Sequence, residues 1–397
     1  MRKLARPLGL YVTITATLGC CGCDVLLVEL LNAVFEERPA ASAGFTCIVS
    51  AELQTVVAGA RFPVNLVFLP DGTLLYSEKN TGVVRAVLPS GDLLADPVAD
   101  FPTAGLAQGG LLGLALGPDF DQTGHLYAGH SANILPFDNA WPRSEYRIVR
   151  VTIQNLATVP GSEQRVATLP ASSLPGHEGG NIHFGPDGML YVSLGDRLNN
   201  TAPNIEAQDP AALAGKILRL RPDGSIPNDN PFGPASPGFA IGLRNTFDFA
   251  FDPVNGRLFG GDNGFGGPTE ELNLLEAGGN YGWPLVGGVA DTPEELASIA
   301  QTPAYHDPLA IIDVAPTGVT FDVAGRFGEQ FRSDMFIAEW VPGTIRRVRL
   351  ASDRRSVVDS ETFAAGIPGG MNDIEFSPAG LLYVSTGGAI LRIVPSP

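Results

Sequence analysis

Apolar and polar positions follow one phrase that recurs along the chain. An apolar pair precedes a turn of Pro, Asp and Gly residues, and an apolar run with Tyr or Phe follows that turn. Each copy is typical of two strands joined by a tight turn, because aromatic and β-branched residues favour strands. The six copies, about 50 to 70 residues apart, occupy 67–76, 116–127, 184–192, 251–259, 321–337 and 376–384.

The six copies predict an all-β fold, a six-bladed β-propeller of four-stranded antiparallel blades over residues 51–397. Repeats that cannot bury a face alone form radial blades, and the segments between copies would supply the remaining strands and the top loops. We expect Leu53–Val57 to pair with Ile390–Val394, since an unclosed ring would leave open edges. Pro293–Ala300 predicts one short helix with Thr292 as its N-cap. Two β-sandwiches are the less favoured alternative, because no linker interrupts the repeat.

Composition narrows the class of partner. Charged residues make up 17% of the chain and apolar residues 44%, which supports a large buried core rather than disorder. The formal net charge of −17 makes the chain a poor partner for nucleic acid or anionic lipid. An anionic ligand would therefore need locally placed Arg or Lys. Neither a GxGxxG fingerprint nor a P-loop is present, which argues against nicotinamide and nucleotide chemistry.

Residues 1–23 predict an export signal, and 24–50 a linker or anchor segment. A positive start precedes the apolar run 8–19, which is too short to span a bilayer alone. Cys20 follows a small residue and is the expected lipidation site, so we expect a periplasmic or cell-surface lipoprotein, held to a membrane only by its lipid. An uncleaved anchor is the alternative. Cys47 is expected to pair with Cys21 or Cys23.

Four Gly-rich segments carry the candidate chemistry. They read AQGGLLG at 107–113, HEGGNI at 177–182, GLRN at 242–245, and GDNGFGG at 261–267 running on to EELN and GGNYGWP. In this order they are similar to the soluble quinoprotein glucose and aldose-sugar dehydrogenases, and the resemblance covers roughly Ala51 to Val394. The NYGWP run with its upstream Glu-x-Asn is the specific part, because many propellers have the turn repeats.

The resemblance implies oxidation of a sugar or related alcohol that depends on PQQ and Ca²⁺, with electrons passed to a periplasmic acceptor. His177 would be the general base, a role that suits an imidazole because its pKa lies near working pH. Gln108, Arg244 and Asn245 would contact the cofactor, and the Arg fork suits its oxygens. The alternatives are a structural loop His, an Arg paired with a neighbouring acid, and a Gln that caps a turn. His183, inside a predicted strand, is expected to pack.

The resemblance also implies two calcium sites. The backbone carbonyls of Gly264 and Phe265 would bind the cofactor's Ca²⁺, although the family usually has Pro at the second position. Glu271, through its carboxylate, and Tyr281, through its carbonyl, would bind a structural Ca²⁺, which favours such mixed oxygen ligands. Glu270 is expected to be a solvated acid.

The chain departs from the family at its last blades. Glucose-specific members carry a Lys near Val341 and two Arg near Gly370 and Asn372, which help to hold the cofactor's carboxylates. Each lost charge-assisted contact would cost about 1.5–3 kcal/mol. Arg346 and Arg347 are neighbours in a predicted strand, so only one could face the channel, and Trp340 would either stack on a planar ligand or pack. The alternative function is a non-redox exported propeller: a ligand-binding lipoprotein or a calcium-dependent lactonase-like hydrolase.

Overall fold

The computed structural model describes residues 44–105, 108–133, 144–170, 176–197, 204–265, 269–341 and 343–396. Within these ranges, no helix is long and apolar enough to cross a membrane. The predicted export signal, the lipidation site Cys20 and the proposed disulfide partners Cys21 and Cys23 lie outside the described residues. The described Cys47 is half-buried, and burial raises the pKa of its thiol.

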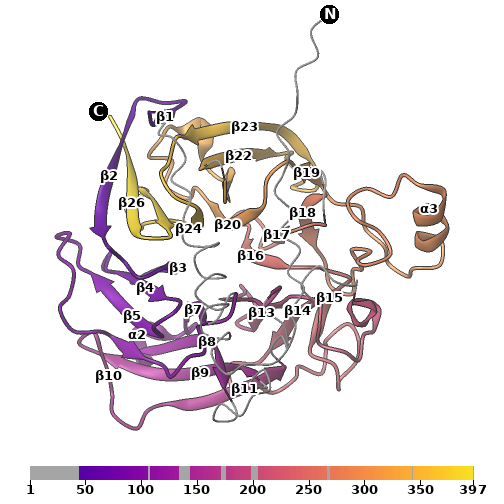
Figure 1. The fold of residues 1–397 in the computed structure, drawn as a ribbon, viewed down its shortest axis with the longest axis horizontal. Coiled ribbons are helices and arrows are strands. Elements are labelled where there is room, and N and C mark those ends of the chain that lie inside the picture. Colours follow the sequence, from indigo (N-terminus) through magenta and orange to yellow (C-terminus); the bar gives the residue numbers. More distant parts are fainter. Residues whose placement is uncertain are drawn as a thin grey trace, which may run out of the picture.

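The predicted six-bladed propeller is confirmed, and the six sheets are arranged as a ring (Figure 1); the axis of this ring is called the channel. Blade one holds β3 (Pro63–Phe68), β4 (Leu74–Glu78), β5 (Val83–Val87) and β6 (Ala99–Asp100). Blade two holds β7 (Leu111–Leu116), β8 (His125–Asn133), β9 (Ser144–Gln154), β10 (Ala157–Thr158) and β11 (Gln164–Pro170). Blade three holds β12 (Gly179–Phe184), β13 (Leu190–Leu194), β14 (Lys216–Leu220) and β15 (Gly238–Ile241).

The last three blades complete the ring. Blade four holds β16 (Thr246–Phe251), β17 (Leu258–Asp262), β18 (Glu270–Leu275) and β19 (Ala310–Ile312). Blade five holds β20 (Pro316–Phe321), β21 (Met335–Glu339), β22 (Thr344–Leu350) and β23 (Val357–Ala365). Blade six holds β24 (Met371–Phe376), β25 (Leu382–Thr386) and β26 (Ala389–Pro395), together with β2 (Ala51–Ala58). As expected, β2 closes the ring, since it pairs with β26 and places Leu53 opposite Ile393.

All six repeats form the first two strands of a blade. The turns owe their shape to Asp side chains: Asp71 Oδ1 accepts the backbone N–H of Thr73 at 2.8 Å, and Asp187 Oδ1 that of Met189 at 3.1 Å. Such Asx turns satisfy a backbone donor two residues on. In blade two a short helix, α2 (Phe120–Thr123), takes the place of the tight turn.

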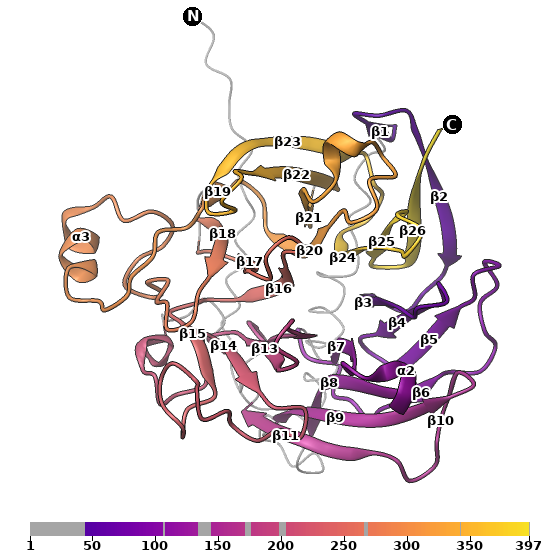
Figure 2. The ribbon, with the colours of Figure 1, turned by 180° about the vertical axis from the view of Figure 1, so that it is seen from behind.

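Two features lie outside the simple blade plan. The strand β1 (Thr46–Cys47) pairs with β23 and adds a fifth strand to its blade, so the sheet structure begins before the expected boundary at residue 51. The predicted helix forms as α3 (Pro293–Ile299), and the Thr292 side chain accepts from the Glu295 N–H in a capping box. The 276–309 segment that carries α3 projects from the ring (Figure 2). Two short 3-10 turns, η1 (Ile205–Gln208) and η2 (Glu329–Phe331), lie in other connections.

The inner strands are joined by buried polar side chains. Asn65 Oδ1 accepts the Leu114 N–H at 2.9 Å in the next blade, and Asp373 Oδ2 accepts the Leu66 N–H at 2.7 Å. Asp248 Oδ2 likewise accepts the Val319 N–H at 2.7 Å. Because each inner strand has a register shift in its pairing near these positions, side chains take over the hydrogen bonds between neighbouring blades.

Candidate active site at one mouth of the channel

The predicted residues gather at one end of the ring. Gln108, His177 and Arg244 precede β7, β12 and β16, the innermost strands of blades two, three and four. Since all blades have the same strand direction, residues that precede their inner strands lie at the same mouth of the channel. The structure therefore brings these three candidates to one face.

His177 is held by a carboxylate that the sequence analysis did not single out. Its Nδ1 lies 2.6 Å from Asp196 Oδ1, and both side chains are nearly buried. A carboxylate only accepts hydrogen bonds, so Nδ1 carries a proton, and in the neutral imidazole Nε2 keeps a lone pair. The backbone of His177 is left-handed, with φ 50°, which is uncommon for a residue with a side chain. This geometry leaves Nε2 able to accept a proton.

Gln108 supports this unusual backbone. Its side-chain oxygen accepts the backbone N–H of His177. Next to it, the Lys79 ammonium donates to the carbonyl of Gly109 at 3.2 Å and lies 5.0 Å from the centre of the Phe62 ring. Lys79 is a positive charge beside the Gln108 loop that sequence reasoning missed. In the structure, Gln108 thus positions His177 as well as facing the mouth.

Trp283 connects His177 to Arg244. Its indole Nε1 donates to Asp196 Oδ2 at 2.9 Å, and the Arg244 guanidinium lies 5.3 Å from the centre of its ring. The same guanidinium lies 5.6 Å from the Phe265 ring and donates from Nη1 to the Asn263 carbonyl at 2.7 Å. An aromatic face beside a cation is a favourable arrangement. Gln108, His177, Asp196, Arg244 and Trp283 form one contiguous group, the mouth cluster.

Asp262 fixes the backbone of Arg244 and Asn245. It accepts their backbone N–H groups at 2.9 and 2.8 Å and the Thr246 hydroxyl at 3.0 Å. Burial raises the pKa of Asp262. Asp196 and Asp262 each follow a Gly just after or at the end of the second strand of a blade, in LGD and GGD. That shared Gly-Asp signature is the sequence signal that could have identified both.

The loop after Asp262 departs from one expectation. Glu270 is not a solvated acid: its Oε2 accepts the Gly264 N–H at 2.6 Å, and burial raises its pKa. The Phe265 N–H is held by the Thr269 hydroxyl at 2.9 Å, while the Phe265 side chain is 53% exposed. The expectation was wrong because the Gly264 N–H donates to Glu270, the first residue of β18. Gly264 and Phe265 lie beside the mouth cluster.

Glu271 lies in a buried setting. Its carboxylate accepts the Gly288 N–H at 2.8 Å and the Asn273 side-chain amide at 2.9 Å, and burial, then Asp262, raise its pKa to about 8. Among the described residues, the buried Asn273 Oδ1 has no hydrogen-bond partner. A buried acid next to an orphan oxygen fits a hard cation.

The Tyr281 side chain is committed elsewhere, because its hydroxyl donates to the Leu274 carbonyl at 2.5 Å. Only the backbone carbonyl of Tyr281 would therefore serve as a ligand. In the described ranges, no three His, Cys, Asp or Glu side chains are grouped as a metal site. A calcium site here would consequently depend on carbonyl and amide oxygens in addition to Glu271.

The last blades offer no basic side chain to the mouth from the positions considered. Arg346 pairs with Glu339 at 2.6 Å, and the buried Arg347 pairs with Asp334 and Glu361 within blade five. Both Arg residues lie on β22, the third strand from the channel, so neither faces it. Asn372 donates to the Pro63 carbonyl at 2.8 Å. Trp340 is half-buried, and its carbonyl accepts the Met371 N–H.

His183 is a structural residue, as expected. Its Nε2 lies 3.1 Å from Asp248 Oδ1, and its ring packs edge-on against Phe249 at 4.8 Å between centroids. It lies on β12, near the end of that strand farther from His177 in the chain.

Comparison with known proteins agrees with this geometry. The chain is 31% identical over 260 residues to quinoprotein glucose dehydrogenase B of Acinetobacter calcoaceticus. The matched stretch covers 60% of this chain and 53% of that protein. It is 27% identical to aldose sugar dehydrogenase YliI of Escherichia coli over 84% of this chain and 90% of that one.

Solved structures agree as well. A glucose dehydrogenase of Thermus thermophilus superposes with a TM-score of 0.72 and 31% identity over 87% of this chain and all of that one. The PQQ-bound form of aldose sugar dehydrogenase from Streptomyces coelicolor superposes with a TM-score of 0.67 and 26% sequence identity, over 90% of this chain and 99% of that one. Residues 60–393 match the family model described as Glucose / Sorbosone dehydrogenase. The chain therefore belongs to the glucose/sorbosone dehydrogenase family.

Proposed function

We propose that this protein oxidises a sugar or a related alcohol with PQQ and Ca²⁺, and that His177 removes the hydroxyl proton. The observation that carries the proposal is the Asp196 carboxylate, which binds His177 Nδ1 at 2.6 Å and Trp283 Nε1 at 2.9 Å. Because Asp196 fixes the tautomer, Nε2 is the free base that general-base catalysis requires. The proton of the sugar C1 hydroxyl passes to Nε2 as its O–H bond breaks.

The donor set of the mouth cluster partly fits PQQ. The quinone, when bound, supplies the two-electron acceptor for the hydride from C1. Arg244 would contact its carboxylate or quinone oxygens, supported by Asn245, while the flat faces of Trp283 and Phe265 suit a planar ring system. Gln108 would donate from its amide, and Lys79 adds positive charge beside it. Trp283 would also keep water away from the Asp196–His177 hydrogen bond.

Calcium would occupy two places in this proposal. The carbonyls of Gly264 and Phe265 would bind the cofactor's ion, and the peptide that carries the Gly264 carbonyl is oriented by the hydrogen bond from the Phe265 N–H to the Thr269 hydroxyl. Glu271 and the Tyr281 carbonyl would bind the structural ion, with Asn273 Oδ1 as a further oxygen. The buried Asp262 and Glu271 carboxyl groups interact in this region, where burial and then Asp262 raise the pKa of Glu271, and a divalent cation would favour the ionised forms of both.

We further propose that the chain is exported and held at a membrane through lipid on Cys20, where it would pass electrons to a periplasmic acceptor. This part of the proposal rests on the sequence of residues 1–23, and the absence of Cys beyond Cys47 agrees with it. A neutral sugar substrate suits a mouth in which Arg244 is already surrounded by aromatic rings and by the Asn263 carbonyl.

One observation favours a second function. Arg346 and Arg347 are bound to acids within blade five, and Val341 and Asn372 offer no positive charge. A mouth with fewer cations than the cofactor's carboxylates would bind PQQ weakly. The second candidate is a non-redox propeller, either a ligand-binding protein or a calcium-dependent lactonase-like hydrolase.

One experiment separates the two. The purified chain is mixed with PQQ and Ca²⁺, and its absorbance and glucose-dependent dye reduction are measured alongside lactone hydrolysis. The proposal predicts a saturable PQQ spectrum and dye reduction that needs both additions. No PQQ binding, with or without lactone hydrolysis, would overturn it in favour of the second function.

A further inference from the structure

One cavity lies away from His177, on the outer rim between blades three and four. Its walls form because the first part of the 276–309 segment runs beside β15, the outer strand of blade three. Backbone hydrogen bonds from Gly278 to Phe239 (2.8 Å) and from Tyr281 to Ile241 (3.0 Å) record this path. The chain returns after α3, where Asn280 donates to the Ala304 carbonyl at 2.9 Å. A space remains between the climbing and the returning strands of this insertion.

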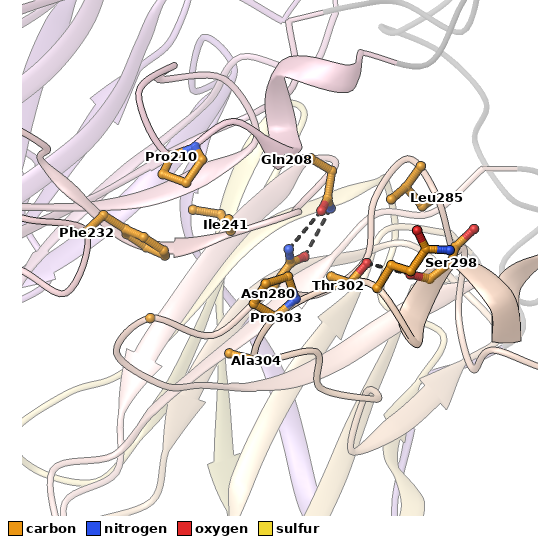
Figure 3. A pocket seen from close by; sticks show the side chains of 12 residues that line it. Gln208, Pro210, Phe232, Ile241, Asn280, Leu285, Ser298, Thr302, Pro303 and Ala304 are labelled. Carbon is orange, nitrogen blue, oxygen red and sulfur yellow. Dashed lines mark hydrogen bonds between the residues drawn. The ribbon is translucent and has the colours of Figure 1, made fainter.

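The cavity has a volume of about 520 Å³, within the range of roughly 300–1,000 Å³ found for small-molecule sites. An amide pair lies between an apolar wall with Phe232 and the end of α3 with Ser298 (Figure 3). Among the described residues, no charged side chain lines it, although the chain carries a net charge of −17. Its lining is Gln208, Pro210, Phe232, Ile241, Gly278, Asn280, Leu285, Ser298, Gln301, Thr302, Pro303 and Ala304.

The amide pair keeps unused hydrogen-bonding capacity. Gln208 Nε2 donates to Asn280 Oδ1 at 3.0 Å and to the Trp283 carbonyl at 2.7 Å, and Asn280 Nδ2 donates back to Gln208 Oε1 at 2.8 Å. An amide has two donor hydrogens and two acceptor lone pairs. These contacts leave one lone pair on Gln208 Oε1 and one hydrogen on Asn280 Nδ2. The pair is therefore rigid and still able to bind a ligand.

The wall at α3 offers acceptors. The Ser298 hydroxyl donates to the Glu294 carbonyl at 2.9 Å, and the Thr302 hydroxyl donates to the Ser298 carbonyl at 2.9 Å. Their hydrogens are spent on the helix, so their oxygens present lone pairs. A matching ligand must donate several hydrogens, carry no charge and present apolar C–H faces to Phe232 and Leu285. A sugar ring meets all three conditions.

We propose that this rim cavity binds a neutral carbohydrate ring. Trp283 of the mouth cluster contacts this site, because Gln208 donates to the Trp283 carbonyl while the Trp283 indole donates to Asp196. The inference goes beyond the proposed oxidation and does not require it, since the binding chemistry comes only from amides, hydroxyls and apolar side chains.

Calorimetry on the full chain without PQQ tests the proposal, with methyl β-D-glucopyranoside as the probe. This probe lacks a free C1 hydroxyl and cannot be oxidised there, so binding is measured apart from turnover. We expect binding of the glucoside and none of glucuronate, because no cation lines the cavity to bind its carboxylate. Thr302→Val and Phe232→Ala should each weaken the affinity for the glucoside by about 2–10-fold, as expected for one lost contact.

Thr123→Val is the matched control, since the Thr123 hydroxyl also donates to a carbonyl four residues earlier, at 3.0 Å, but on α2. It should leave the affinity unchanged. Two results would overturn the proposal: no glucoside binding by a wild-type chain that is folded by circular dichroism, or binding that His177→Ala weakens and the two cavity variants do not. Failure of PQQ reconstitution alone would contradict the proposed oxidation and leave this site standing.

Discussion

The indole Nε1 of Trp283 donates a hydrogen bond of 2.9 Å to Oδ2 of Asp196, the carboxylate whose other oxygen holds His177. The two residues are far apart in the chain and come from different blades. Asp196 follows β13, while Trp283 ends the climb of the 276–309 segment along β15. The proposed base is thus oriented by one blade and stabilised from the next.

Asp196→Asn should reduce kcat strongly while PQQ binding is preserved. An Asn side chain can donate to Nδ1 and thereby place the proton on Nε2, the wrong tautomer for a base. We expect a loss of about 10²–10⁴-fold in dye-linked kcat. Trp283→Phe, which removes only the second hydrogen bond to Asp196, should cost less. A kcat for Asp196→Asn equal to that of the wild type would remove Asp196 from the mechanism.

His177→Ala should abolish turnover and leave the PQQ titration nearly unchanged, because the imidazole is proposed to move a proton rather than to hold the cofactor. The expected loss is about 10²–10⁴-fold. His183→Ala serves as the control, since His183 contacts Asp248 and Phe249 away from the mouth. Retained activity in His177→Ala would show that another group is the base.

Calcium should stabilise the fold. A ligand that binds only the folded state adds about 2.7 kcal/mol at a hundredfold excess over Kd. EGTA should lower the Tm of the wild type, and Ca²⁺ should restore it. Glu271→Gln should blunt this response by removing the ligand charge at nearly constant shape, while Glu294→Gln, at an exposed position of α3, should change it little. Identical melting with and without Ca²⁺, and no bound metal, would eliminate the structural site.

Glu375 should make stability fall as the pH rises. Burial, and then the nearby Asp248, raise the pKa of Glu375 to about 8, whereas an unfolded Glu titrates near 4.3. The folded state keeps this proton over that interval, so its contribution is complete below about pH 4 and is lost as the pH approaches 8.

This single group changes the free energy of unfolding by at most about 1.4 kcal/mol per pH unit. Glu375→Gln should therefore flatten the change in unfolding free energy between pH 5 and pH 8, measured by urea titration. Glu294→Gln, at an exposed position of α3, is the control. Equal pH dependence in the wild type and in Glu375→Gln would contradict this assignment.

Export through Cys20 predicts a mature chain that begins at that residue and fractionates with membranes. Cys20→Ser should release the protein into the soluble fraction, because the thioether that carries the lipid could not form. Mass spectrometry of the purified protein provides the check. Detection of an intact Met1 terminus would count against lipidation.

The sequence by itself determined the architecture of this protein. Strand and turn preferences are local, and each of the six Pro/Asp/Gly phrases forms the first hairpin of a blade. The ring closure of Leu53–Val57 on Ile390–Val394 was also predictable, because an open propeller would leave two unpaired edges. The α3 helix followed from its N-cap Thr292 and Pro293.

Only the tertiary structure decided which side chains meet. Asp196 and Trp283 contact each other because blade packing brings together loops that are 87 residues apart in the chain, and no local preference encodes that contact. Glu270 was predicted to be solvated, yet the fold turns the Gly264 N–H toward it. The rim cavity likewise exists because the 276–309 insertion lies against the neighbouring blade. Hydrophobic periodicity and turn chemistry act over a few residues, whereas hydrogen bonds at the mouth depend on distances that closure of the whole ring sets.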